Sequence, residues 1–134
     1  MLETMGDLFR SRIRSEADIL CLVENGVTCM IYTEVAEHLR LPRDAIGPEA
    51  IIRRQLKAHA RLDSNKTQRL IRIGRAYALG RDLLGSDERT IAWLHKPARY
   101  LRDKAPITPI ELATRDAGVR LLEEKLLRMQ HGIF

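Results

Sequence analysis

The feature that most constrains the fold is the helical spacing of apolar residues along the chain. In the segment 70–83 apolar positions recur three and four apart and cover more than one side of a helix, namely Leu70, Ile71, Ile73, Ala76, Tyr77, Leu79 and Leu83. Side chains at such spacings share a helix face, whereas a half-buried strand requires alternation with period two, which the sequence lacks. We therefore expect an all-α fold with a central helix in this segment.

Local signals mark the helix ends. Gly26 and Gly85 suit left-handed C-caps, Pro48 suits a first helical position, and Thr108-Pro109-Ile110-Glu111 has the form of a capping box. The expected helices cover about 15–24, 29–39, 48–60, 86–96 and 108 onward, with the central helix starting after a cap at Asp63, Ser64 or Asn65. The longest loop is expected at residues 97–107.

Composition bounds the class of protein. The 134 residues, 45% hydrophobic and 31% charged, suffice for one compact domain or two very small ones sharing a core. The apolar runs are too short to span a bilayer and the N-terminus carries no signal pattern, so we expect a cytoplasmic protein without a membrane partner. Cys21 and Cys29 fit that compartment as reduced thiols.

Catalytic and metal-binding patterns are weak. The four histidines fall in different expected elements and lack ligand spacing to Cys, Asp or Glu. The sequence contains neither a phosphate-cradling glycine loop nor a nucleophile elbow. We therefore expect a protein that is not an enzyme and binds no cofactor or metal.

Basic residues concentrate in one segment. Residues 40–81 hold eleven Lys/Arg against three Asp/Glu, a charge of +8, which leaves −3 for the remainder of a chain with net charge +5. Clustered positive charge is typical of phosphate binding, although a solvated basic surface without a ligand produces the same pattern.

Within that segment, the apolar spacing resembles a helix-turn-helix. The residues in positions that hold two helices crosswise are Val35, Ala36, Leu39, Leu41 and Ile46. The second helix would be the recognition helix, which places its side chains in the major groove of DNA. The predicted DNA-binding residues are Arg53, Arg54, Lys57 and Arg61.

Two alignments of this motif remain open. The recognition helix begins near Pro48 in one and near Arg53 in the other, and both place Arg53 and Arg54 within it. Arg40 stands where the turn usually prefers Gly, and Glu49 and Ala50 replace polar or basic residues at the helix start.

The C-terminal half resembles a known family, the antitoxins of the Xre/MbcA/ParS type. The segment RLIRIGRAYALGRDLLGSDERTIAWLHKPARYL is similar to the family's central helix and Trp-Leu-x-x-Pro turn, here Trp93, Leu94 and Pro97. PIELATRDAG resembles its Pro-Leu-Glu-Leu element, and LLRMQHGIF resembles its closing helix and tail. The loop between Leu101 and Pro109 is a few residues longer than the usual family turn.

The resemblance implies an N-terminal helix-turn-helix (Xre-like) bundle at 1–62, packed with a small helical toxin-binding domain at 63–134. It implies two partners. One is a cognate RES-domain toxin, which acts on NAD, and the other is operator DNA, to which a homodimer of the chain binds and so represses its own operon. The toxin-binding residues it implies are Trp93, Pro97, Leu122, Leu126, Met129, Gly132, Ile133 and Phe134.

Alternatives stay open at this point. The tip Gly132-Ile133-Phe134 either anchors the toxin or packs on its own domain beside Trp93. The whole chain is an antitoxin that represses and neutralises, a neutralising module without DNA binding, or a stand-alone helix-turn-helix regulator.

Overall fold

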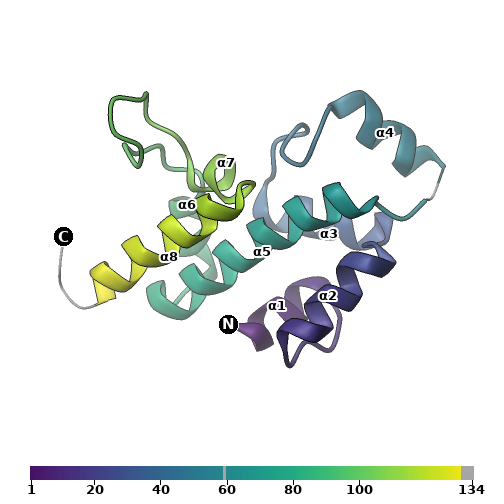
Figure 1. The fold of residues 1–134 in the computed structure, drawn as a ribbon, viewed down its shortest axis with the longest axis horizontal. Coiled ribbons are helices and arrows are strands. Elements are labelled where there is room, and N and C mark those ends of the chain that lie inside the picture. The colour runs from purple at the N-terminus through teal and green to yellow at the C-terminus, as the bar shows by residue number, and fades with distance from the viewer. Residues whose placement is uncertain (59, 131–134) are drawn as a thin grey trace. The chain divides into compact units, whose positions relative to one another are not determined.

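The computed structural model describes residues 1–58 and 60–130, and within them the chain forms eight α-helices (Figure 1). These are α1 (Leu2–Phe9), α2 (Glu16–Asn25), α3 (Cys29–Leu39), α4 (Glu49–Lys57), α5 (Ser64–Leu84), α6 (Asp87–Leu94), α7 (Pro109–Ala113) and α8 (Asp116–Gln130). Extended pairing in the described residues is limited to an isolated antiparallel bridge between Ala98 and Ile107. The predicted all-α class is confirmed.

Contacts divide the chain into two compact units, Met1–Ile71 and Arg72–Phe134, with the division inside α5. The domain boundary proposed from the sequence, between 62 and 63, falls just before the start of this helix. Taken singly, none of the described helices is long and apolar enough to cross a membrane; α2 and α3, bent by 117° at their junction, reach that length and composition only as a pair.

The first unit contains a helix that the sequence did not predict. α1 has no side-chain cap, and it ends where Arg10 takes a left-handed conformation and donates its backbone N–H to the Gly6 carbonyl. Met5 and Phe9, on one face of α1, are almost completely buried. Burial of these two side chains therefore stabilises a helix whose ends carry no local signal.

α2 and α3 begin and end where the sequence predicts. Ser15 and Thr28 are their N-caps, accepting hydrogen bonds from the backbone N–H groups of Asp18 and Ile31. Gly26 ends α2 with φ of 80°, and an added Cβ there would lie 2.5 Å from the Leu62 carbonyl oxygen, so this position needs glycine for both conformation and space.

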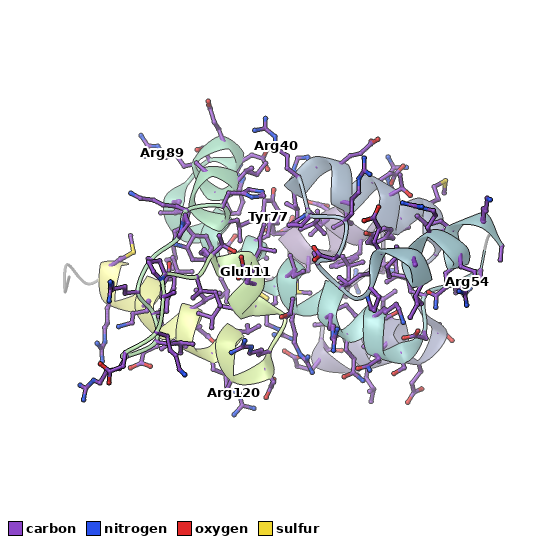
Figure 2. The ribbon with its side chains drawn as sticks, turned by 90° about the horizontal axis from the view of Figure 1, so that it is seen from above. Arg40, Arg54, Tyr77, Arg89, Glu111 and Arg120 are labelled. Atoms are coloured by element: carbon purple, nitrogen blue, oxygen red, sulfur yellow. The ribbon has the colours of Figure 1, made fainter. Side chains whose placement is uncertain are left out.

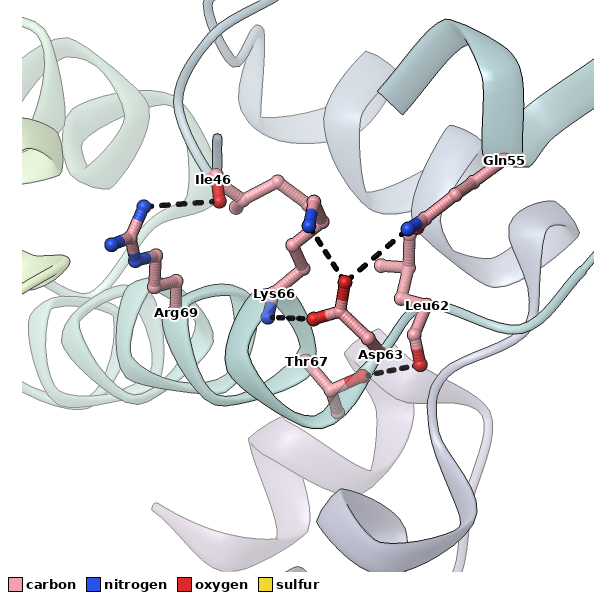
Figure 3. A network of polar contacts seen from close by, with 7 residues as sticks. All are labelled: Ile46, Gln55, Leu62, Asp63, Lys66, Thr67 and Arg69. Atoms are coloured by element: carbon pink, nitrogen blue, oxygen red, sulfur yellow. Dashed lines mark hydrogen bonds and ion pairs between the residues drawn. The ribbon is translucent and has the colours of Figure 1, made fainter. Parts of the chain in front are cut away.

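A polar network joins the end of α4 to the start of α5 (Figure 3). The Asp63 carboxylate accepts hydrogen bonds from the Lys66 backbone N–H at 2.9 Å, the Lys66 ammonium at 2.6 Å and the Gln55 side-chain amide at 3.2 Å. Of the three caps considered from the sequence, Asp63 is therefore the one that holds the N-terminus of α5.

The second unit is built on α5, α6, α7 and α8. Gly85, with φ of 81°, follows α5, and Ser86 caps α6 by accepting from the Arg89 backbone N–H at 3.1 Å. Thr108 caps α7 in the same way, accepting from Glu111 N–H at 3.2 Å. The buried apolar side chains of this unit are Ile73, Ala76, Tyr77, Ala78, Leu94, Ile110, Leu112, Ala113, Val119, Leu122 and Leu126.

The closing helix differs from the prediction because it is two helices rather than one. α7 ends at Ala113 and α8 starts at Asp116. Gly118 sits so close to the end of α7 that an added Cβ would lie 1.9 Å from the Leu112 carbonyl oxygen. The missing side chain at Gly118 lets the two helices meet at this sharp corner.

Candidate functional site

Trp93 lies at the junction of α5 and α6. An added Cβ on Gly80 of α5 would lie 3.1 Å from Cζ3 of the Trp93 ring, so the ring packs directly on the backbone of α5. The indole also hydrogen-bonds Tyr100, whose pKa burial raises despite that bond. Trp93 is half-buried, so it anchors α6 and leaves part of its surface accessible.

Pro97 begins the loop that the sequence predicted at 97–107. It is exposed, and the loop closes immediately after it through paired backbone hydrogen bonds between Ala98 and Ile107, of 3.1 and 2.9 Å. The predicted Trp-Leu-x-x-Pro turn thus places one half-buried aromatic and one exposed proline at the entrance of a closed loop.

Leu122 and Leu126, two of the predicted toxin-binding residues, face the interior. Their side chains are 0% and 1% exposed. They hold α8 on its own unit, and in this conformation neither offers surface to a partner.

The end of α8 presents apolar surface instead. Met129 is 42% exposed, and Leu127, which the sequence analysis did not single out, is 44% exposed. Leu127 was missed because it lies outside the apolar stripe that marks the buried face of α8. The predicted contacts Gly132, Ile133 and Phe134 lie outside the described residues.

α5 and α6 are further joined by a partly buried polar contact. The Tyr77 hydroxyl donates a hydrogen bond of 2.5 Å to the Asp87 carboxylate in the first turn of α6. Burial, followed by this bond to an anion, raises the pKa of Tyr77 to about 12. Tyr77 therefore stays neutral and fixes the start of α6 relative to α5.

The predicted recognition helix corresponds to α4, which begins at Glu49 after Pro48 and so agrees with the first of the two alignments. Its outer face carries Arg53, Arg54 and Lys57, all exposed, and Arg54 projects outward in Figure 2. Ile52 is buried on the opposite face.

Arg53 is restrained by an acidic neighbour. The Glu49 carboxylate contacts Nη2 of Arg53 at 2.7 Å and Nη1 of Arg43 at 3.5 Å. These residues line a shallow pocket of about 240 Å³ between α3 and α4, together with Tyr32, Ile52 and Leu56. Glu49, noted in the sequence only as a departure from the motif, thus partly neutralises the positive charge of α4.

Arg61 has a structural contact that its sequence position does not reveal. Its guanidinium donates a 3.0 Å hydrogen bond to the carbonyl of Gly26, at the C-terminal end of α2. Cations at this end of a helix are favourable because they meet its partial negative charge. Arg61 therefore ties the segment after α4 to α2.

Cys29, the first residue of α3, connects this helix to α4 and to the segment after α4. Its thiol donates hydrogen bonds to the carbonyls of Ala60 and, at 3.6 Å, Gln55. Burial raises the pKa of the Cys29 thiol. The described residues hold no group of three or more His, Cys, Asp or Glu side chains arranged for a metal ion.

Comparison with protein families defines the class of this second unit. Residues 79–132 match the family described as the antitoxin Xre/MbcA/ParS C-terminal toxin-binding domain. The match begins in α5 and extends through α6, α7 and α8, over the motifs that carry the resemblance in the sequence. No curated protein matches the chain. The predicted resemblance is therefore confirmed for this domain, and the domain supports an antitoxin role with a toxin as partner.

Proposed function

We propose that this chain is the antitoxin of a type II toxin–antitoxin system, which binds and occludes a RES-type, NAD-consuming toxin and represses its own operon. The observation that carries the proposal is the family match, which covers most of the unit formed by α5 to α8. The mechanism requires no chemistry from this chain, because neutralisation is a steric block and repression is occupation of DNA.

The proposed toxin contact centres on the end of α8. Leu127 and Met129 are exposed, and the apolar residues Ile133 and Phe134 of the tip follow them closely in the sequence. An aromatic anchor inserted into a partner's cleft can supply most of the binding free energy of an interface. Trp93 and Pro97 would add contacts from the α6 end of the same unit.

The proposed DNA contact is the outer face of α4. Arg54 and Lys57 are exposed there, and Arg53 joins them if its ion pair with Glu49 opens. Arg can read guanine through two hydrogen bonds, and Lys adds attraction to phosphate. A homodimer would present two such helices to a palindromic operator.

Co-expression with the toxin encoded by the neighbouring gene tests the neutralising role. We compare the full chain with a version that ends at Gln130, and score growth rescue and co-purification. Rescue by the full chain alone, with the shortened chain still folded by circular dichroism, supports the tail as a toxin contact. Equal rescue by both places the block elsewhere, and a harmless neighbour leaves the stand-alone regulator as the better reading.

A second function, neutralisation without DNA binding, is favoured by one observation. Glu49 lies at the start of α4 and pairs with both Arg43 and Arg53, which lowers the positive charge available to phosphates. Binding to the chain's own promoter distinguishes the two functions. Repression is supported if the affinity of the unaltered chain for the promoter falls steeply with salt and this salt dependence is abolished by Arg53→Ala with Arg54→Ala. If the unaltered chain does not bind the promoter, the second function is supported.

A further inference from the structure

The basic segment at 40–81 is more engaged within the fold than its charge suggests. Lys66 is paired with Asp63, and Arg43 and Arg53 share Glu49. Arg69 and Arg72 donate hydrogen bonds to the carbonyls of Ile46 and Thr114, as Arg61 does to that of Gly26. Many of these cations therefore stabilise the chain itself and are not held ready for a ligand.

The loop between α6 and α7 differs from that segment, because its basic side chains form no ion pair within the described residues. The second unit carries twelve Lys/Arg against eight Asp/Glu, a charge of +4, and residues 96–104 alone contribute +3 of it. The four cations of this loop, all exposed, are Lys96, Arg99, Arg102 and Lys104. Across residues 1–58 and 60–130, none of the four is held in an ion pair.

The loop is held in a defined shape. The bridge between Ala98 and Ile107 closes its base, and a turn in which Lys104 N–H donates to the Leu101 carbonyl at 3.4 Å forms its tip. Asp103 occupies the left-handed position of that turn, with φ of 61°, a conformation that Asp tolerates better than most residues. Cations on such a scaffold lose less conformational entropy on binding than cations on an unstructured segment.

The two largest apolar side chains of the loop are half-buried, and its exposed apolar residues are Pro97, Ala105 and Pro106, which lie outside the tip. Tyr100 is half-buried and bonded to Trp93, and Leu101 is also half-buried. A protein interface needs an apolar or aromatic core, which the exposed tip of this loop does not offer. Contacts to phosphates need only positioned Arg and Lys side chains, which the tip has.

We propose that the loop formed by Lys96, Arg99, Arg102 and Lys104 binds the phosphodiester backbone of a nucleic acid duplex, independently of base sequence. This goes beyond the antitoxin function, in which the second unit binds toxin and α4 alone contacts DNA. It also does not depend on α4, because the two surfaces belong to different units and are altered by different substitutions.

The test measures how binding of the full chain to duplexes depends on salt. A 30-base-pair DNA duplex of random sequence and an RNA duplex of the same sequence are titrated between about 50 and 200 mM salt, so that the source of the phosphates is also assigned. The loop variant combines Arg99→Gln, Arg102→Gln and Lys104→Gln. The control combines Arg89→Gln, Arg115→Gln and Arg120→Gln, which removes the same charge from exposed positions of the same unit (Figure 2 shows Arg89 and Arg120 pointing outward).

We expect the loop variant to bind at least one duplex roughly tenfold more weakly and to reduce the slope of log affinity against log salt by about 0.9 for each phosphate that it no longer neutralises. The control should reduce the slope by less than about 0.9 in total. A further variant, Arg99→Lys with Arg102→Lys, should retain binding because phosphate attraction needs charge and not the guanidinium fork. Circular dichroism and the melting temperature check that each variant is folded.

Three results would overturn the proposal. One is equal slopes for the unaltered chain and the folded loop variant on both duplexes. Another is equal losses of affinity in the loop variant and the control, which would reflect net charge alone. The third is a loop variant that keeps its affinity for duplexes but no longer co-purifies with the toxin, which would assign the loop to the protein partner.

Discussion

Asp63 couples the stability of the first unit to pH. The hydrogen bond from the Lys66 side chain and, to a smaller extent, that from the Lys66 backbone N–H hold the pKa of Asp63 at about 2, below its ordinary value near 3.8. A carboxylate with a depressed pKa contributes stability that is fully present above its unfolded-state pKa and is lost as pH falls through the folded-state pKa, here between about pH 4 and pH 2. Because the side chain is 45% exposed, solvent screening reduces this contribution to roughly 1 kcal/mol.

Substitution Asp63→Asn tests this coupling. We expect it to lower the free energy of unfolding by roughly 1 kcal/mol at pH 6, and to have a much smaller effect near pH 2, where about half of the unaltered carboxyl groups are protonated in the folded state. Urea unfolding at the two pH values measures the difference. An effect of the same size at both would mean that Asp63 acts as a neutral cap and not as a charge.

Gly118 is the residue on which the α7–α8 corner depends most directly. Gly118→Ala would place a methyl group 1.9 Å from the Leu112 carbonyl oxygen, so the backbone would have to move. We therefore expect the free energy of unfolding to fall by at least about 2 kcal/mol. Gly85→Ala is the matched control, because its φ of 81° is unfavourable for Ala but the space around it is open. The control should cost about 1 kcal/mol by denaturant unfolding. Equal losses for the two variants would contradict the steric explanation.

At the scale of the element, α4 carries a built-in restraint on its own charge. Removing the anion by Glu49→Gln releases Arg53 and Arg43, so we expect duplex affinity to rise several-fold and the salt slope to steepen by up to about 0.9 for each additional phosphate that is neutralised. Fluorescence anisotropy with a labelled duplex measures both. Glu37→Gln, an exposed position on α3, makes the same charge change without touching α4. If both variants bind equally tightly, net charge explains the higher affinity and Glu49 has no specific role.

The elements that could be predicted from sequence are those whose ends have local causes. Ser86 and Thr108 cap the helices that follow them, and Gly26 and Gly85 end the helices before them, because capping depends on residues within one turn. α1 was missed because it has no cap signal and depends on burial of Met5 and Phe9. The break between α7 and α8 was missed because it arises from a close approach between backbones.

The candidate site was less predictable than the fold, because its residues are sorted by contacts distant in sequence. The family resemblance grouped Leu122 with Met129 as toxin contacts, yet Leu122 is buried and Met129 is exposed near the end of α8. The helix-turn-helix pattern grouped Arg61 with Arg54 as DNA contacts, although the Arg61 guanidinium donates a hydrogen bond to the carbonyl of Gly26, 35 residues away. The charge of −3 for the residues outside 40–81 did not reveal the loop cations, because that sum combines them with acidic residues such as those of α8.

At the scale of the whole molecule, the division into two units predicts that repression and neutralisation can be separated. Arg53→Ala with Arg54→Ala alters exposed side chains of the first unit, and we expect it to abolish repression of a reporter under the chain's own promoter while the toxin is still neutralised. Leu127→Glu with Met129→Glu alters exposed apolar positions of the second unit and should have the opposite effect, weakening the toxin complex by about 2 kcal/mol or more. Glu123→Gln, an exposed position of α8, is the control for the second pair and should leave both activities unchanged.

These two variants together test whether each function resides in one unit. Because all four substituted side chains are exposed, the changes remove interactions with partners and leave the cores intact, so melting temperatures should stay within a few degrees of the unaltered chain. If the α4 variant lost both activities while remaining folded, neutralisation would require the first unit as well, and the toxin surface would extend beyond residues 79–132. If the α8 variant still neutralised the toxin, the exposed end of α8 would not be the toxin-binding surface, and the surface around Trp93 and Pro97 would be the next to alter.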